Sequence, residues 1–316
     1  GLLQVARQSK SIVNENTSLN KNVRMALSLV GRDTYNAGFG YPLRNTVVLP
    51  DNRLSTLLVI PNDADTTRDT IAPIIAGNNL TLNTYNTAAN IYTDQITLLF
   101  KDTTFNQVGG VSQTLSINAA TTSGTGIDEI IPISGSNTLC RVNDLYLISG
   151  NTGSTLGVST ALSGTNIVQF SNGDVLGFNL TGTTGPLRAI TVPATIQRVR
   201  MITYFVTADG TFTRREYVNT PAAVPAVGFA DEPLIYGVED LQIRYVMDDG
   251  SVSDNPSAGP NGIPGDADDT PTNLAAVRQV RFTVSVRSTE LNSANQPYRF
   301  SQTATFSTRN LGYDVN

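Results

Sequence analysis

The first 34 residues carry an apolar stripe at helical spacing, and any fold of this chain has to begin by covering it. Apolar residues recur at intervals of three, four and seven, while the charged side chains lie off the stripe. Gly38 and Gly40 follow, and both readily adopt the positive φ angles that end a helix, while Pro42 prevents its continuation. The sequence therefore predicts one long amphipathic helix from Leu2 to about Thr34. The stripe consists of Leu2, Val5, Ile12, Leu19, Val23, Ala26, Leu27 and Val30.

The start of this helix lacks the usual N-terminal signals. The segment GLLQVAR contains no Ser, Thr, Asp or Asn that could cap the first turn, and the stripe is already in phase there. The pattern favours a helix that continues upstream of Gly1. A frayed first turn is the alternative interpretation.

The rest of the chain reads as short strands separated by turns. β-type runs occupy residues 54–61, 94–101, 196–206 and 211–218, and Ala208-Asp209-Gly210 between the last two is a strong hairpin signal. Residues 238–247 and 277–288 alternate strictly between apolar and polar side chains. Such alternation predicts antiparallel strands with one face in solvent and the other covered, here by the first helix.

Residues 112–193 are rich in Gly, Ser and Thr and poor in charge, but their short runs keep several large apolar residues. We interpret this segment as an inserted small β-subdomain. The predicted fold class is α+β and β-rich, with a long N-terminal helix packed on an antiparallel sheet. The predicted parts are the helix and its exit turn (1–41), a first β part (42–111), the insert (112–193) and the remaining strands (194–316), which carry an acidic loop at 248–271.

Composition excludes several classes of function. The chain has no His, so a Ser/His/Asp triad and a His-ligated metal are both excluded. The single Cys140 rules out an internal disulfide and is expected to be a small buried side chain. A net charge of −5 argues against binding to nucleic acid or acidic membranes.

No residue pattern supports catalysis. The adjacent acids Asp128-Glu129 and Glu239-Asp240 lie on predicted strands, where neighbours point to opposite faces and cannot flank one bond together. No phosphate-binding glycine loop is present. The sequence predicts that the protein is not an enzyme and holds no organic cofactor.

The acidic loop is the one candidate metal site. Its carboxylates could gather around Ca²⁺, which takes six to eight oxygen ligands, but their spacing differs from that of an EF-hand. A solvated loop is the alternative. The acids are Asp248, Asp249, Asp254, Asp266, Asp268 and Asp269.

The helix exit VRMALSLVGRDTYNAGFG resembles that of type IV pilin-like proteins, and specifically the PilW family of minor pilins. The likeness continues in CRVNDLYLISG, RVRMITYFVTADGTFTRREY, PLIYGVEDLQIRYVMDDG and AVRQVRFTVSVRS, in the family's order. The resemblance implies a pilin-like fold and, upstream of this sequence, a cleaved leader and an apolar helix half. The paired cysteines of many pilins are missing.

The resemblance implies a structural subunit of a type IV pilus, anchored in the inner membrane before assembly and then displayed outside the cell. Its partners would be other major and minor pilin subunits and proteins of the pilus tip or assembly machinery. Leu2, Leu3 and Val5 would face the filament, while Ile12, Leu19, Val23, Ala26, Leu27 and Val30 would pack on the protein's own sheet.

Two other functions stay open at this stage. One is a pseudopilin of the J type from a type II secretion system, which has a related architecture. The other is a free-standing extracellular binding module such as an adhesin, for which Tyr85, Tyr92 and Tyr146 are candidate sugar platforms.

Overall fold

The structure is a computed structural model of the 316-residue chain. It describes residues 2–42, 47–60, 68–85, 90–117, 122–123, 128–134, 136–180, 185–219, 227–256, 276–292 and 295–311. Within these ranges, residues 2–9, 122–123, 128–132 and 188–189 are described by their backbone alone.

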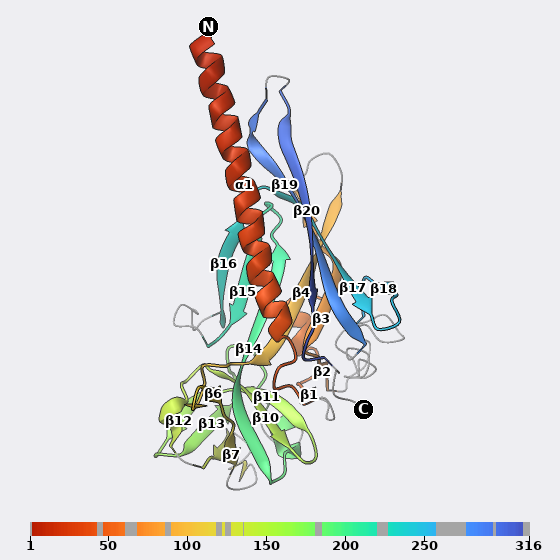
Figure 1. Cartoon of the computed structure of the whole chain (residues 1–316). Helices are drawn as coiled ribbons and strands as arrows, with labels where there is room; N and C mark the ends of the chain where they lie inside the picture. Colours follow the sequence, from red (N-terminus) through yellow and green to blue (C-terminus); the bar gives the residue numbers. More distant parts are fainter. Residues whose placement is uncertain are drawn as a thin grey trace.

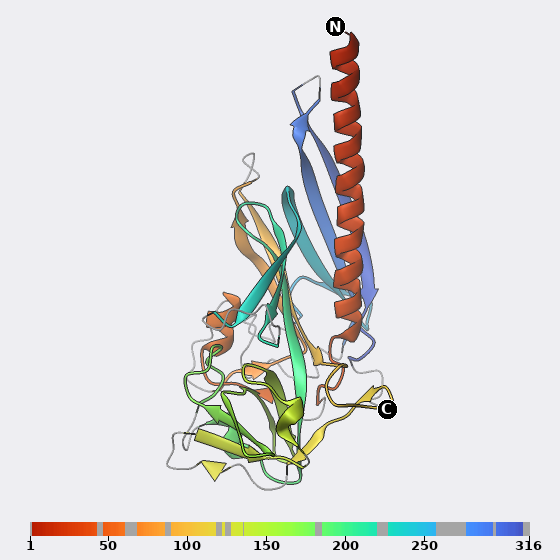
Figure 2. The same ribbon diagram turned by 90° about the vertical axis from the view of Figure 1, so that its left-hand side faces the viewer.

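Helix α1 is the longest element and spans Leu2–Asn36. Its end follows from local chemistry, because Gly38 and Gly40 adopt φ angles of 80° and 73° that side chains other than glycine disfavour. The Gly38 amide then donates to the carbonyl of Leu99 on a strand, which turns the chain into the β part. The first turns of α1 extend past all the strands (Figures 1 and 2).

The largest sheet has ten strands, ordered β16-β15-β14-β10-β11-β1-β2, with β3 and β4 joined through β14 and with β7 beside β14. All of its pairs are antiparallel except β1 with β11. Its strands are β1 (Val47–Val48), β2 (Thr70–Ile71), β3 (Ile74–Asn83), β4 (Ile91–Lys101), β7 (Leu115–Ile117), β10 (Leu145–Gly150), β11 (Ser154–Val158), β14 (Ala194–Val206), β15 (Phe212–Tyr217) and β16 (Phe229–Ile235).

A four-stranded antiparallel sheet of order β18-β17-β19-β20 lies beside α1 (Figure 2). Its strands are β17 (Val238–Met247), β18 (Val252–Ser253), β19 (Val277–Leu291) and β20 (Pro297–Ser307). Helix α1 contacts β19 and β20 along their length, and it also reaches β16 and β4 of the larger sheet. The helix is therefore held by two different sheets.

The remaining elements are short. They are a sheet of β12 (Ala161–Ser163), β13 (Ile167–Ser171), β9 (Asp128–Pro132) and β8 (Thr122–Ser123), a hairpin of β5 (Gln107–Val108) and β6 (Val111–Ser112), helix α2 (Arg53–Leu58), and the 3₁₀ turns η1 (Asn137–Leu139) and η2 (Pro186–Ala189).

Two apolar cores hold these layers together. The larger one joins the C-terminal half of α1 to the inner faces of both large sheets and includes Val30, Tyr204 and Phe282. The smaller one lies between the β12-β13-β9-β8 sheet and β10, where Tyr146 packs edge-on against Phe105 and Phe170. Burial of side chains of this size stabilises the fold by about 1.5–3 kcal/mol each.

The expected fold class, a pilin-like helix on one antiparallel sheet that carries a small insert, is wrong as a description of this architecture. Among the described residues, strands make up 49% and helices 16%, and the strands form several sheets. Strands β7 and β10, from the segment 112–193 predicted as an insert, pair with the first half of the thirteen-residue β14, whose second half pairs with β4 and β15. Alternation in a sequence shows which face of a strand is covered, but not which strand pairs with it.

The strand expected at residues 54–61 is also wrong, because this segment forms helix α2. Its buried residues are Leu54 and Leu58, which are four residues apart and share one face of a helical turn. A short apolar run without clear periodicity fits either a strand or a helix, and the tertiary packing decides between them.

Candidate functional site

The apolar stripe of α1 is buried toward the C-terminal end of the helix and less buried at Ile12 and Leu19. Val23, Ala26, Leu27 and Val30 are buried in the larger core. Further toward the N-terminus, Ile12 and Leu19 are only half-buried. The side chains of Leu2, Leu3 and Val5 lie outside the part of the chain that the structure describes, so their assignment to a filament interface stays a prediction.

Apolar side chains also lie on the solvent side of α1. Val13 is 59% exposed and Met25 is 63% exposed. A groove of about 560 Å³ runs beside Met25 between α1 and β20, where Tyr298 and Phe300 form its other wall. This part of the helix therefore presents both apolar and cationic groups, since Lys21 and Arg24 line the same groove.

Glu15 fastens the outer half of α1 to the β19–β20 hairpin. Its carboxylate accepts hydrogen bonds from the backbone amide and hydroxyl of Thr289, both at 2.8 Å, and from the amide of Glu290 at 3.2 Å. Bonds of this kind, between a charged acceptor and amide donors, are stronger than neutral ones. They set the direction in which the helix leaves the strands.

Asp33 forms the joint at the inner end of α1. Its side chain is 1% exposed, and its Oδ2 accepts hydrogen bonds from the hydroxyl of Tyr204 at 2.7 Å and from Nε of Arg214 at 3.2 Å. Burial and the neighbouring Asp33 charge raise the pKa of Tyr204, so the phenol stays protonated and keeps donating. Arg32 adds an ion pair from the solvent side. The last turn of the helix is thus bound to β14 and β15.

This joint continues along the sheet through Glu216. The carboxylate of Glu216 receives two hydrogen bonds from Arg200, at 2.7 and 2.6 Å, and one from Arg214 at 3.1 Å. All three residues lie on β14 or β15. The buried charges of the joint therefore have partners on two adjacent strands, which is the condition under which a buried ion pair is tolerated.

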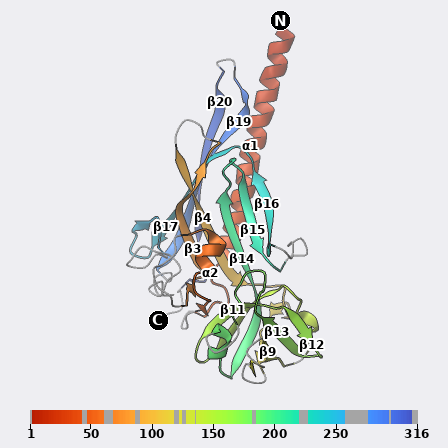
Figure 3. The same cartoon turned by 180° about the vertical axis from the view of Figure 1, so that it is seen from behind.

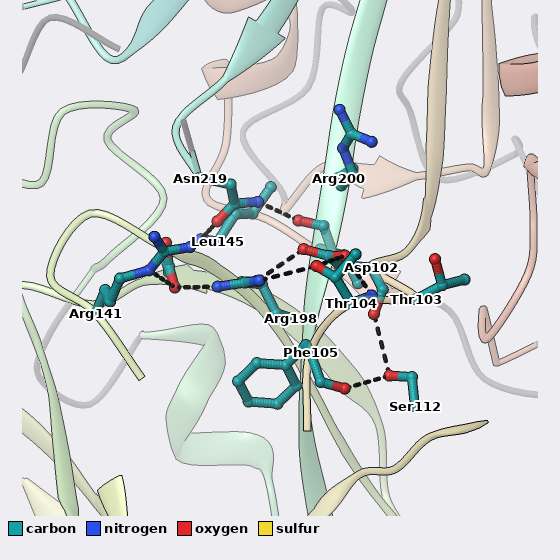
Figure 4. A network of polar contacts seen from close by, with 12 residues as sticks. Asp102, Thr103, Thr104, Phe105, Ser112, Arg141, Leu145, Arg198, Arg200 and Asn219 are labelled. Atoms are coloured by element: carbon teal, nitrogen blue, oxygen red, sulfur yellow. Dashed lines mark hydrogen bonds and ion pairs between the residues drawn. The ribbon is translucent and has the colours of Figure 1, made fainter. Parts of the chain in front are cut away.

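A second buried network joins β14 to the loops below it (Figure 4). Arg198 donates to Asp102 at 2.8 Å and to Asp144 at 3.0 Å, and its guanidinium lies 5.3 Å from the ring centre of Phe105. Burial would raise the pKa of Asp102, but hydrogen bonds from Thr104 and the Arg198 charge lower it overall. Both carboxylates are engaged by donors of the protein itself, so we interpret this network as a structural link between elements.

The described part of the acidic loop does not assemble a metal site. Asp248 lies 3.6 Å from Arg278, Asp249 accepts the amide of Ser251, and Asp254 pairs with Arg244. No group of three or more possible ligand residues occurs among the described residues. The other three acids of the calcium hypothesis, at positions 266, 268 and 269, lie outside the described residues.

Most of the other candidate residues are buried or paired with neighbouring side chains. Tyr146 is fully buried, Tyr85 lies under the guanidinium of Arg287 at 4.3 Å, and Tyr92 is 46% exposed. Glu239 pairs with Arg287 and Arg299. Cys140 is buried, and burial raises the pKa of its thiol. The side chains of Asp128 and Glu129 lie outside the described part. Of the three tyrosines proposed as sugar platforms, Tyr92 is the one that is exposed.

Asp33 and Glu15 are the functional positions that sequence reasoning missed. A signal for Asp33 existed, because it follows Val30 by three residues and precedes Ala37 by four, which places it on the buried stripe. An acidic residue in such a position requires a buried partner. No comparable signal existed for Glu15, whose partners lie more than 270 residues away.

Comparison with known proteins leaves the chain unassigned. No protein-family model matches it, and no curated protein matches it. In the described part of the chain, neither α-helix has the length and apolar character needed to cross a bilayer.

Proposed function

We propose that this protein is a non-catalytic structural subunit of an extracellular filament of the type IV pilus kind, a minor pilin of the PilW type. The observation that supports it best is the N-terminal half of α1, whose first turns lie beyond the protein's own strands (Figures 1 and 2). The apolar stripe of the sequence continues onto this stretch through Leu2, Val5 and Ile12.

In this proposal the stripe on the first turns of α1 is covered by other helices. Covering one Leu or Val side chain stabilises a complex by about 1.5–3 kcal/mol. Neighbouring subunits that contribute the same helix would cover the stripe repeatedly along a filament, and head-to-tail contacts of this kind generate open helical assemblies. The β sheets would then lie on the outside, where they meet other subunits or the pilus tip.

The joint at Asp33 also supports a structural role. A filament subunit has to keep its helix and its strand layers in one orientation, and Asp33 binds both Tyr204 and Arg214 from within the protein. Glu15 adds a second attachment farther along the helix. In this proposal the precursor is anchored in the inner membrane by an apolar helix half upstream of the present sequence, and no cofactor takes part.

The test compares two charge-changing variants in the source cells. Leu2→Glu together with Val5→Glu places carboxylates on the stripe, whereas Lys10→Glu, on an exposed position, is the matched control. Filaments are sheared from the cells, and the chain is detected in the sheared and cell-bound fractions by immunoblot. We expect the stripe variant to be absent from sheared filaments at unchanged cellular level, and the control to be present.

Two results would contradict the proposal. One is that the wild-type chain is released as a free protein and never sediments with filaments, which would favour the binding module. The other is that the stripe variant enters filaments as efficiently as the Lys10→Glu control.

A further inference from the structure

We propose that a pocket far from the helix stripe binds a carboxylate that carries an apolar group. The pocket has a volume of about 540 Å³ and lies where α2, the loop after β13 and the β15–β16 pair meet. Pockets of this size and at such junctions are typical of small-molecule sites. This inference does not depend on the proposed role in a filament.

The floor of the pocket is apolar. Leu57 from α2, Val175 from the loop and Phe229 from β16 are half-buried and pack against the larger core, and Leu176 beside them is 5% exposed. Three separate segments of the chain thus supply one continuous apolar lining. A branched or aromatic group of a ligand would lose its contact with water there.

Two guanidinium groups line the same pocket. The guanidinium carbon of Arg215 lies over the ring of Phe229, 3.7 Å from its centre, and Arg215 donates hydrogen bonds of 2.7 and 2.8 Å to Asp231. Arg53 belongs to α2, is exposed, and pairs with no acidic side chain among the described residues. Arg53 is therefore the cation that is available to a ligand.

The position of Arg53 depends on Gly177. A Cβ atom at Gly177 would lie 3.1 Å from the guanidinium carbon, and the φ angle of 68° also favours glycine there. The carboxylate of Asp174 lines the same pocket but forms no ion pair with Arg53, and it accepts hydrogen bonds from the amides of Leu176, Phe178 and Asn179. The loop after β13 therefore supplies no side-chain ion pair to the guanidinium of Arg53.

Backbone strain marks the rim of the pocket. Val59 adopts a left-handed conformation, with φ 56° and ψ 35°, and its side chain is 77% exposed. This conformation is unfavourable for a β-branched residue, and such strain is concentrated at ligand sites. Val59 adds an apolar side chain to the lining of the pocket.

These features together select the chemistry of the ligand. The planar guanidinium of arginine can donate to both oxygens of a carboxylate. A hydrocarbon group attached to that carboxylate would be stabilised by burial against the apolar lining of the pocket. A free carboxylic acid and the C-terminal residue of a peptide share this chemistry. An inorganic anion would leave the floor uncovered.

The test is a titration of the whole chain followed by NMR, with three probes. These are N-acetyl-leucine, the tripeptide Gly-Gly-Leu, and N-acetyl-leucinamide, which has the same side chain without a carboxylate. We expect saturable binding of N-acetyl-leucine and binding of the amide that is weaker by about tenfold or more. Tight binding of the tripeptide as well would identify peptide C-termini as the source, and its failure would identify free acids.

Variants localise the binding to this pocket. Arg53→Gln should weaken binding of N-acetyl-leucine about tenfold, and Arg53→Lys, which keeps the charge but not the fork, should weaken it less. Arg24→Gln, an exposed arginine on α1, is the control and should bind as the wild type does. Absence of saturable binding, equal binding of acid and amide, or unchanged binding by Arg53→Gln would overturn the proposal.

Discussion

Asp33 shows, at the scale of single residues, how one buried charge couples the helix to the strands. It accepts from Tyr204 and Arg214 and is 1% exposed. We expect Asp33→Ala to lower the free energy of unfolding by about 3 kcal/mol, because Arg214 would lose its partner on α1 inside the protein. Urea denaturation followed by circular dichroism measures this change.

Arg32→Gln is the matched control for Asp33→Ala. Arg32 pairs with the same carboxylate, but its side chain is 59% exposed, so water replaces the interaction. The loss should stay below about 1 kcal/mol. Equal losses in the two variants would show that burial of the joint does not matter.

The buried carboxyl group of Asp94 is expected to make the stability of the protein depend on pH. Its carboxylate accepts the amides of Asn79 on β3 and Ile243 on β17, and so joins the two large sheets. Burial raises the pKa of Asp94 to about 6, while those two amides partly oppose the shift. The folded state therefore binds the proton more tightly than the unfolded state, in which the pKa is about 3.9.

The sign of the effect follows from this difference. The contribution of Asp94 to stability is fully present below about pH 4 and is lost as pH rises through about 6, by an amount of about 2–3 kcal/mol. We expect the stability difference between wild type and Asp94→Asn to shrink over that range, as measured by urea denaturation at several pH values. A difference that does not change with pH would contradict the raised pKa.

At the scale of elements, Gly31 sets how closely α1 approaches β20. A Cβ atom at this position would lie 2.3 Å from the nearest ring atom of Phe306. Gly→Ala in a helix normally stabilises by about 1 kcal/mol, but here the ring has to move, so we expect Gly31→Ala to destabilise by about 1–3 kcal/mol. Ser28→Ala, at an exposed position of the same helix, is the control in chemical denaturation.

The expected result for Gly31 depends on the helix and strand being in contact in solution. If Gly31→Ala instead raised the stability, α1 would stand farther from β20 than the structure shows. The larger core would then have to be covered in another way, because Val23, Leu27 and Val30 lie on the same helix.

At the scale of the whole molecule, the outer turns of α1 contribute little to the fold. The buried part of the stripe starts at Val23, and the first turns lie beyond the strands. We expect a chain that starts at Ser11 to keep its free energy of unfolding within about 1 kcal/mol of the full chain, as is usual for changes outside the core. Urea denaturation of the two chains measures this.

A chain that starts at Leu29 is the comparison for this truncation. It lacks Val23, Ala26 and Leu27, and deletion of buried side chains of the larger type costs about 2–5 kcal/mol each. It should be unfolded or strongly destabilised. If the chain from Ser11 were equally damaged, the outer turns would belong to the folding unit and not to an assembly surface.

Local patterns in the sequence identified many of the elements. Residues 196–206 and 211–218 form β14 and β15, and Gly210 in the predicted turn has a φ angle of 80°. Residues 238–247 and 277–288 lie in β17 and β19, with most of their apolar side chains buried. These features depend on the spacing of apolar side chains along one segment, and that spacing is visible in the amino-acid sequence.

The pairing of distant segments was decided by the tertiary structure alone. Several features depend on which segments meet in space. They are the pairing of β14 with β10, the helical state of residues 53–58, and the surroundings of Asp33 and Arg53. Many strands with the same alternation compete for each edge, and a charge finds its partner only after the sheets are assembled. Periodicity is a local property of the chain, whereas sheet order and buried charge pairs are properties of the folded whole.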